Sequence, residues 1–406
     1  MRLLHTADWH LGRSLHGVDL LEHQAAFLDH LVDLARVSKV SAVLVSGDVY
    51  DRAVPPVQAV SLLSATLRRL TEFTQVVLIS GNHDSATRLG FGAELMRPGL
   101  HLVTQVARVG QAIELGVSAD AGPCLVYPLP YLDVDLARGV LAEGEEPLAR
   151  SHQAVVGAAM DRVRADLARR RGRDGKTRGQ AGTSRPGASQ AAAKTVVLAH
   201  AFVAGGAASE SERDIRVGGI DVVPASLFAG VDYVALGHLH GPQVVNAGAV
   251  GPVMRYAGSP LALSFSEMGQ VKSSVLVDFT GAEVGIELIP APVPRPLNKV
   301  TGTLAELLGS QYDAVADDWL WVTVTDPARP QDLMQRLDRR FAHRLVTRHV
   351  PEGTASASPA GPRAQVADPM AVAAEFVAYA GGVAPNEAER AALGSALEAT
   401  LTERGA

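Results

Sequence analysis

The sequence contains a single cysteine, Cys124, among 406 residues. One thiol excludes an intramolecular disulfide and a cysteine-based zinc site, and its apolar neighbours Leu125 and Val126 predict a thiol buried in a strand. Aromatic residues make up only 5% of the chain, which argues against a surface on which successive nucleic-acid bases stack.

Long hydrophobic runs are also missing. No apolar stretch of the sequence approaches the roughly 20 residues that a transmembrane helix needs. The first residues lead straight into a predicted strand and lack the pattern of a signal peptide. We therefore expect a cytoplasmic protein with no membrane partner.

The chain has no excess of positive charge. Its formal net charge of -6 and its pI of about 6.1 argue against a protein that coats nucleic acid nonspecifically. Any contact with DNA must then be a local patch, helped by bound metal ions. Hydrophobic residues, at 47%, supply ample core for a globular enzyme, and the length predicts two or three domains.

Five short polar motifs interrupt this apolar background. Each follows a hydrophobic run that predicts a β-strand. Ligands of open α/β sheets gather beyond the carboxyl ends of strands, so we expect the five motifs to assemble one site. In chain order the motifs are Asp8-Trp9-His10, Gly47-Asp48, Gly81-Asn82-His83-Asp84, a lone His200 and Gly237-His238-Leu239-His240.

The residue types in these motifs are those that bind metal ions. The candidate ligands exceed what one ion can use, which indicates two ions that share a bridging carboxylate, with Asp48 as the natural bridge. A shell that mixes imidazole nitrogens with oxygens favours Mn, with Fe, Zn or Mg as alternatives. The candidate ligands are Asp8, His10, Asp48, Asn82, His200, His238 and His240.

Each motif taken alone has a second interpretation, because Gly, Asp and Asn are common in strand-end turns for conformational reasons. A single Gly-Asp pair fits that interpretation better than it fits a metal site. Five motifs in order, each at the end of a strand, favour the metal site.

The first part of the chain alternates strands with helices. Apolar residues at helical spacing predict helices near residues 20–34 and 55–70. Strands that are apolar almost throughout, separated by such helices, predict a sheet buried on both faces. The layers are therefore α/β/β/α or α/β/α. Further strands are predicted over residues 100–109, 111–115 and 124–127.

A helix is predicted over residues 152–170, and periodicity is then lost over 171–192. The second segment is rich in Gly, Ser, Ala and Arg, which predicts a mobile loop. Its basic residues have two interpretations. We favour a solvated loop of no direct function over a contact with a DNA backbone.

Proline-rich and low-complexity stretches mark the expected domain boundaries. Alternating prolines from Pro290 to Pro296 predict a stiff connector. The organisation predicted from these stretches is a first domain at 1–290, a small α/β unit at 297–350, a linker at 351–369 and a helical tail at 370–406.

The small unit and the tail have their own local signals. Strands are expected over 319–325 and 344–349, with a helix over 331–341 between them. In the tail, Asn386 and Glu389 have the spacing of a capping box. The stripe Leu393, Leu397 and Leu401 then follows at four-residue spacing, which is typical of one apolar helix face.

The ordered motifs Ala-Asp-Trp-His-Leu-Gly, Ser-Gly-Asp-Val-Tyr-Asp, Gly-Asn-His-Asp and Gly-His-Leu-His resemble the calcineurin-like metallophosphoesterases. More narrowly, the chain is similar to a bacterial branch of DNA nuclease subunits, through Met1–Gly12, residues 214–218, Tyr256–Leu261 and the extra domains. The resemblance covers nearly the whole chain. It implies a sandwich of two mixed β-sheets flanked by helices, with a small α/β accessory capping domain and a C-terminal helical tail.

The resemblance also implies which residues share each ion. One ion is expected on Asp8, His10, Asp48 and His240. The second is expected on Asp48, Asn82, His200 and His238.

His83 is implied to be the family's catalytic histidine and not a ligand. It is expected to protonate or stabilise the leaving 3′-oxygen. Asp84 is expected to hold the His83 ring and support its protonated form. The alternative role for His83 is that of a turn residue that stabilises Asn82.

The implied activity is a Mn-dependent DNA nuclease, with exonuclease action on double-strand ends and endonuclease action on single strands and hairpins. The resemblance further implies an ATPase partner docked on the helical tail, and a homodimer within a heterotetramer, formed by helices near 55–70 and 84–98. Work in DNA repair, replication and recombination would place the protein at the nucleoid.

Two other functions fit the same motifs. One is a small-substrate phosphodiesterase or protein phosphatase with the same metal core, although such an enzyme needs neither the accessory unit nor the tail. The other is a catalytically silent scaffold that binds DNA ends. Intact ligands together with His83 argue against a silent scaffold.

Overall fold

The computed structural model describes residues 1–116, 123–180, 193–209, 222–281, 283–293, 295–352, 370, 373–377 and 384–403. The chain divides into two compact units, Met1–Pro351 and Glu352–Ala406. Residues 214–218, which contribute to the family resemblance, lie outside the described residues, as does most of the expected linker.

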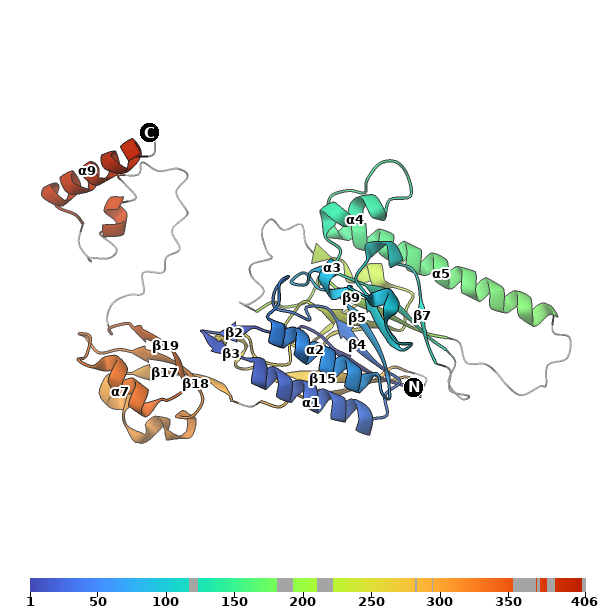
Figure 1. Cartoon of the computed structure of the whole chain (residues 1–406), viewed down its shortest axis with the longest axis horizontal. Helices are drawn as coiled ribbons and strands as arrows, with labels where there is room; N and C mark the ends of the chain where they lie inside the picture. Colours follow the sequence, from blue (N-terminus) through green and yellow to red (C-terminus); the bar gives the residue numbers. More distant parts are fainter. Residues whose placement is uncertain are drawn as a thin grey trace. The chain divides into compact units, whose positions relative to one another are not determined.

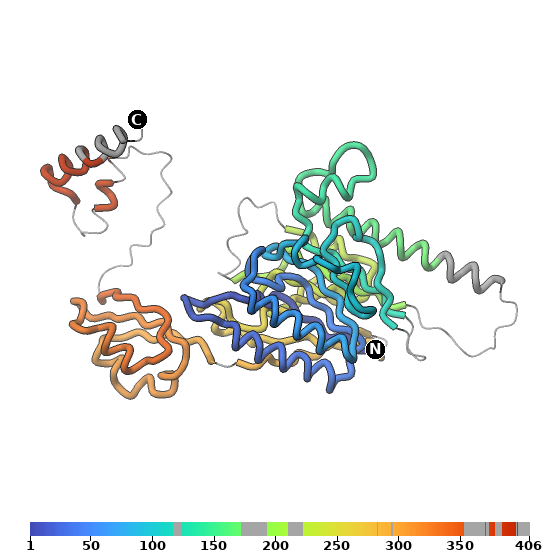
Figure 2. The backbone as a smooth tube through the Cα atoms, in the orientation of Figure 1, coloured from blue at the N-terminus to red at the C-terminus, as the bar shows by residue number. Residues whose placement is uncertain are grey.

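Six of the described strands form the first sheet. Their order is β16 (Gly285–Pro290), β15 (Ser273–Asp278), β1 (Arg2–Thr6), β4 (Ala42–Ser46), β5 (Gln75–Ile79) and β6 (Leu100–Val103). Strands β1, β4, β5 and β6 run parallel, whereas β15 runs antiparallel to β1. Strand β15 comes from the second half of the chain, which Figure 2 draws in yellow within the same compact part as the blue start of the chain.

The second sheet also contains six strands within the described residues. Their order is β13 (Gln243–Val245), β14 (Val253–Tyr256), β12 (Tyr233–Gly237), β9 (Lys194–His200), β8 (Cys124–Leu129) and β7 (Ile113–Leu115). The four inner strands run parallel, and both edge strands are antiparallel. Two short ribbons accompany the sheets, β2 (Ser14–Leu15) with β3 (Val18–Asp19) and β10 (Phe202–Val203) with β11 (Val222–Val223).

The two sheets pack face to face. Leu3 and Leu198 belong to one buried cluster between the sheets, while the next residue along β1, Leu4, points to the other side, as the two-residue period of a strand requires. Helices α1 (Leu21–Val37) and α2 (Val57–Leu70) cover the outer face of the first sheet. Helices α4 (Val134–Val140) and α5 (His152–Gln180) and turn η4 (Ala225–Phe228) cover the second. The architecture is α/β/β/α, which confirms the expected sandwich of two mixed sheets.

Helix α5 corrects one expectation. It continues to Gln180 and extends away from the sandwich (Figure 1), although a loop was expected from residue 171. A helix that has already nucleated propagates through polar residues at little cost. The sequence beyond Arg170 has no hydrophobic period that would predict a helix. The rest of the expected loop, 181–192, lies outside the described residues.

The other described helices of the sandwich are short. They are α3 (Ala86–Leu89), η1 (Ala93–Leu95), η2 (Val106–Arg108) and η5 (Phe265–Glu267). The expected strand at 100–109 is wrong in its second half, since β6 ends at Val103 and η2 follows. Across the described residues, no helix combines the length and apolarity needed to cross a bilayer.

A small three-stranded sheet completes the first unit. It consists of parallel strands β17 (Leu297–Gly302), β18 (Trp319–Val324) and β19 (Arg344–His349), packed against α6 (Leu304–Leu307), η6 (Ser310–Val315) and α7 (Leu333–Arg340). Strand β19 has the bounds that the sequence predicts. A further apolar cluster joins this small domain to the sandwich, with Trp319 and Leu297 on one side and Leu20 and Phe265 on the other.

The second unit contains α9 (Glu387–Glu403). The main-chain N–H of Glu389 donates to Asn386 Oδ1 at 3.0 Å, and the N–H of Asn386 donates to Glu389 Oε2 at 2.8 Å. This reciprocal pair confirms the predicted capping box. Leu393 is half-buried, and the side chains of Leu397 and Leu401 are not among those described, so the apolar stripe stays a prediction.

Candidate metal centre

The expected ligands lie at the carboxyl ends of strands in both sheets. Asp8, Asp48 and Asn82 follow the parallel strands β1, β4 and β5 of the first sheet. His200 ends β9, and His238 follows β12, its parallel neighbour in the second sheet. The two sets meet at one edge of the sandwich, where imidazoles from one sheet face carboxylates from the other.

Four of these residues have left-handed backbone conformations, which non-glycine residues rarely adopt. The φ angle is 53° at Asp8, 45° at His10, 47° at Asp48 and 111° at His238. Main-chain bonds between motifs stabilise this backbone, since the N–H groups of Asp8 and His10 donate to the carbonyls of Gly47 and Asp48, each at 3.0 Å. Strain of this kind collects at functional sites.

Two glycines of the motifs are required by close packing. A Cβ atom on Gly81 would lie 2.1 Å from Asp48 Oδ1, and one on Gly237 would lie 2.0 Å from the carbonyl oxygen of Ser46. Neither position has room for a side chain. Gly237 therefore lets the two sheets approach closely, and Gly81 does the same for the loops that follow β4 and β5 within the first sheet.

Asp48 is central to the cluster and only 2% exposed. Its Oδ1 accepts a hydrogen bond from the main-chain N–H of His83 at 2.9 Å. Its Oδ2 lies 3.6 Å from His10 Nε2 and 3.5 Å from His200 Nε2. These separations exceed a normal hydrogen bond and are close to the roughly 3 to 3.5 Å between two ligands that each bind one cation at about 2.1 Å.

His10 and His240 form one group of ligands. Their Nε2 atoms, both buried, lie 3.1 Å apart. Asp8 is fully buried; its Oδ1 lies 4.0 Å from His200 Nδ1 and accepts the main-chain N–H of His238 at 2.9 Å. This bond ties the first motif of the chain directly to the last.

Asn82, His200 and His238 form the other group. Asn82 Oδ1 lies 2.9 Å from His200 Nε2 and 3.1 Å from His238 Nδ1. The far nitrogen of His200, Nδ1, lies 2.8 Å from the carbonyl oxygen of Ser46, which directs Nε2 into the cluster. The division of the ligands between two cations stays a prediction. Among the described residues, possible ligand atoms of Asp8 lie close to those of Asp48 and His200, and those of His10 lie close to Asp48 and His83.

The electrostatics of the cluster suit a cation. Burial disfavours the charged form of His200, yet the carboxylates of Asp48 and Asp8 raise its pKa to about 9. Burial alone would raise the pKa of Asp48, but the nearby His200 and His10 hold the pKa of this carboxyl well below its usual range. Burial also lowers the pKa of His10 to about 4 and that of His238 to about 3, which keeps both rings neutral. The carboxylates thus attract positive charge into the cluster, while the rings of His10 and His238 stay neutral and can act as ligands. This set of donors fits divalent metal ions.

His83 lies beside this cluster. Its ring centroid is 4.8 Å from that of His10. Its Nδ1 lies 2.8 Å from the main-chain carbonyl oxygen of Asp51 and donates to it. This bond leaves the Nε2 side of the ring for the reaction centre.

Asp84 does not have the role expected for it. Its Oδ2 accepts the main-chain N–H groups of Gly81 at 2.9 Å and Val49 at 3.1 Å, and its Oδ1 accepts that of Tyr50 at 2.9 Å. Both oxygens thus bind main chain, so the expectation that Asp84 holds the His83 ring is corrected. Asp84 joins the turn after β5 to the loop after β4, and burial beside the charge of Asp48 raises its pKa to about 6.

Two family models match the chain. Residues 1–127 match the calcineurin-like phosphoesterase model, and residues 293–379 match the type 5 capsule protein repressor C-terminal domain. The chain is 33% identical over 353 residues to the SbcD subunit of nuclease SbcCD from Bacillus subtilis (strain 168), which covers 84% of this chain and 83% of the relative. The chain belongs to the SbcD family of nuclease subunits.

A second curated relative carries the same name. The SbcD subunit of nuclease SbcCD from Escherichia coli (strain K12) is 30% identical over 351 residues, covering 83% of this chain and 81% of the relative. Among solved structures, a dimetal phosphatase from Danio rerio is similar at 11% identity and a TM-score of 0.39, covering 72% of this chain and 97% of that chain. Family membership confirms the resemblance, the calcineurin-like fold and a metal-dependent nuclease class.

Three residues around the ligands were not predicted from the sequence. Asp51 closes the Ser-Gly-Asp-Val-Tyr-Asp motif, so its place in the motif was a usable signal. Glu267 and Lys272 form a buried ion pair at 2.6 Å, and Glu267 also contacts His240. No strand end or periodic pattern marks these two, since Glu267 lies on a single 3-10 turn.

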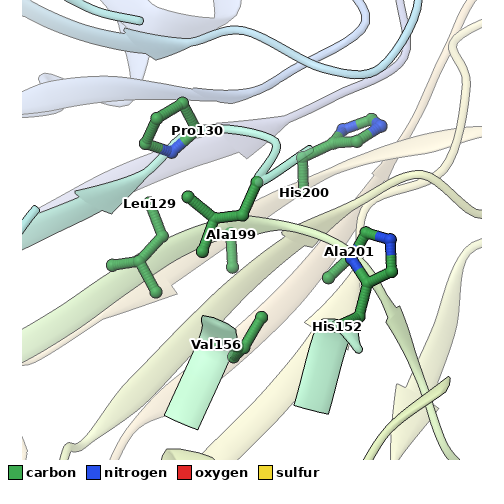
Figure 3. Close-up of a pocket in the computed structure, with 8 residues that line it drawn as sticks. Leu129, Pro130, His152, Val156, Ala199, His200 and Ala201 are labelled. Carbon is green, nitrogen blue, oxygen red and sulfur yellow. The ribbon is translucent and has the colours of Figure 1, made fainter. Parts of the chain in front are cut away.

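A small cavity borders the site on the side of the second sheet. Figure 3 shows His152, at the start of α5, and His200 lining it together with Leu129 and Ala199. Apolar side chains make up most of the wall. The cavity therefore belongs to the packing of β9 and α5 around His200.

Proposed function

We propose that this chain is the nuclease component of an SbcC–SbcD-type complex and hydrolyses phosphodiester bonds of DNA with two divalent cations. The observation that supports it most directly is the position of Asp48 Oδ2, near Nε2 of His10 and of His200. A carboxylate oxygen between imidazoles of two separate groups is suited to bridge two ions.

The ligands are proposed to divide between the two cations as the family resemblance implies. One cation would bind Asp8, His10, Asp48 and His240. The other would bind Asp48, Asn82, His200 and His238. When bound, the pair supplies Lewis acidity toward the phosphate and toward water.

His83 is proposed as the acid for the leaving 3′-oxygen. Its Nδ1–H is taken by the Asp51 carbonyl, so in the protonated ring Nε2–H is the donor that faces the substrate. The bond from its main-chain N–H to Asp48 Oδ1 fixes its distance from the bridging carboxylate. Proton donation to a leaving oxygen needs a group held in this way.

Mn is the proposed metal, with Fe, Zn or Mg as alternatives. Four imidazoles among the proposed ligands suit a transition metal better than Mg, which prefers oxygen. The set also contains two carboxylates and one amide oxygen and lacks cysteine. It is therefore richer in hard oxygen ligands than a typical structural zinc site. The mixed set is the support for Mn.

The small domain at 297–350 is proposed to cap the DNA. On the side of its sheet away from α7, Lys299 Nζ lies 5.5 Å and Arg348 Cζ 4.5 Å from the ring centroid of Trp321. Cations ordered on an aromatic ring are well placed to bind phosphate. The proposed substrates are double-strand ends, cut as an exonuclease, and single strands and hairpins, cut as an endonuclease.

The remaining parts are proposed to bind protein partners. The tail at 370–406 would dock an SbcC-type ATPase, and Phe376, 67% exposed, offers apolar surface for that contact. Val57 on α2, Phe91 and Leu95 are 77%, 84% and 89% exposed, which supports a homodimer through this region, within a heterotetramer. Such a complex would act at the nucleoid, in DNA repair, replication and recombination.

Incubation of the purified chain with Mn and labelled duplex or hairpin DNA, with and without its ATPase partner, tests the proposal. We expect metal-dependent cleavage that the ATPase and ATP stimulate, and none from Asp48→Asn. Hydrolysis of bis(p-nitrophenyl) phosphate without any cleavage of DNA would instead favour a small-substrate phosphodiesterase.

A further inference from the structure

His240 differs from His200 in the group that holds its far nitrogen, and its buried carboxylate partner is itself part of an ion pair. His240 Nδ1 lies 3.3 Å from Oε1 of Glu267, a carboxylate, whereas Nδ1 of His200 faces a main-chain carbonyl. An acceptor at Nδ1 places the proton there and leaves the lone pair of Nε2 for the site. That Nε2 is the atom 3.1 Å from His10 Nε2.

Glu267 is built into the interior. The residue is 0% exposed, and its Oε2 accepts Lys272 Nζ at 2.6 Å and the main-chain N–H of Leu263 at 3.1 Å. A carboxylate removed from water is costly unless charge and hydrogen bonds surround it. An apolar residue would fill the same space at a lower cost in free energy. A buried carboxylate at this position is therefore better explained by a functional role.

Lys272 connects the same pair to the backbone of the ligand. Its Nζ donates to the carbonyl oxygen of His240 at 2.8 Å, to Ser259 Oγ at 3.0 Å and to Gln270 Oε1 at 2.7 Å. The ion pair therefore contacts His240 twice, through the ring and through the main chain. The pair is thus in contact with both the ring and the main chain of His240.

The turn that carries Glu267 is fixed from the other side by the small domain. Phe265, two residues before Glu267 on η5, packs its ring on Trp321 with centroids 5.5 Å apart and planes at 84°. Phe265 and Trp319 also share one buried apolar cluster. Glu267 thus sits on a short turn held between the sandwich and the small domain.

We propose that Glu267 is a positioning residue for His240, which sets the Nδ1–H form of the ring and strengthens Nε2 as a ligand for the cation shared with His10. The inference rests on the proposed two-metal function. Carboxylates behind ligating histidines orient the ring and raise its basicity, and their loss typically lowers metal affinity by about 10- to 100-fold. The effect is expected on one cation only, because His200 and His238 belong to the other group and do not depend on this pair.

The first test measures Mn binding to the full chain by titration calorimetry. In Glu267→Gln we expect one of the two cations to bind about 10- to 100-fold more weakly and the other to bind as in the wild type. Because Glu267→Gln leaves Lys272 buried without its ion pair, the double variant Glu267→Leu with Lys272→Met is measured as well. It removes both charges together and should show the same selective loss.

Asp232→Asn is the matched control. The carboxylate of Asp232 accepts the main-chain N–H and the hydroxyl of Thr195, each at 2.7 Å. Asp232 directly precedes the first residue of β12, at the end of the strand away from the metal centre. Its loss should lower thermal stability without changing either cation. A role for Glu267 in stability alone would make all the variants behave like this control, with both cations bound at wild-type affinity, and would overturn the proposal.

A second readout needs neither a variant nor bound metal. Nitrogen-15 NMR of the histidine rings in the metal-free wild-type chain should show His240 as the Nδ1–H form, and an Nε2–H ring would overturn the proposal. The proposed function fails separately, if the wild type binds two cations and leaves DNA uncut. If the wild type cleaves DNA and the Glu267 variants bind both cations with wild-type affinity, only the positioning role is rejected.

Discussion

Nδ1 of His83 lies 2.8 Å from the main-chain carbonyl oxygen of Asp51, which comes from the loop after the neighbouring strand. Because a carbonyl only accepts, this contact fixes one proton on Nδ1 and turns the opposite edge of the ring toward the cluster. The ring is therefore oriented by the backbone of Asp51 and not by its side chain.

The first prediction separates catalysis from metal binding at His83. His83→Gln should retain two bound cations and slow DNA cleavage by about 10²-fold or more, the usual range of general acid catalysis. Elemental analysis and single-turnover cleavage check the two parts. Loss of a cation from this variant would assign His83 to the ligands, and Asp232→Asn, whose carboxylate binds Thr195 away from the cluster, serves as the control.

The second prediction concerns Asp84, which accepts three main-chain N–H groups. Asp84→Ala leaves these donors without their acceptor, so we expect a loss of about 2 to 4 kcal/mol in the free energy of unfolding of the metal-free chain. Urea denaturation measures it. Unchanged stability combined with a large fall in single-turnover rate would restore a direct role for Asp84 beside His83.

The positions of the strand-end motifs were readable from the sequence because each polar group interrupts an apolar run at the point where a buried strand must end. That single regularity predicted that Asp8 and His238, far apart in the chain, lie together. The sequence did not decide between the layer orders α/β/β/α and α/β/α, because the pattern of a buried apolar strand is the same whether a helix or a second sheet covers it.

Other features had no such signal. The end of α5 was missed because residues beyond Arg170 are polar on every side and show no period. Asp84 was given the wrong partner because adjacency in sequence suggested contact with His83, whereas a turn directs successive side chains apart. Glu267 and Lys272 reach His240 only through the folded arrangement of a 3-10 turn and the strand after it.

The third prediction tests the small domain as a DNA contact. Arg348 stacks on Trp321 on the face of the sheet opposite α7. Arg348→Ala should weaken duplex binding and reduce the slope of log affinity against log salt by about 1, the value expected for one lost phosphate contact. Arg336→Ala, on the exposed side of α7, is the control and should leave the slope unchanged. An equal slope in both variants and the wild type would place DNA elsewhere.

The fourth prediction concerns the second unit, Glu352–Ala406. Truncation after Pro351 should preserve Mn-dependent cleavage by the isolated chain, because every proposed ligand lies in the first unit. It should abolish co-purification with an SbcC-type ATPase and the stimulation by ATP. Full-strength co-purification of the truncated chain would show that the tail is not the principal docking element.

The most direct measurement is the Mn stoichiometry of Asp48→Asn compared with His10→Ala. If Asp48 bridges two cations, Asp48→Asn should weaken both, whereas His10→Ala should weaken one and leave the other near wild-type affinity. The control is the wild-type chain, which should bind two cations per chain in the same titration. Equal stoichiometry in the two variants would contradict a shared carboxylate and, with it, the two-cation centre.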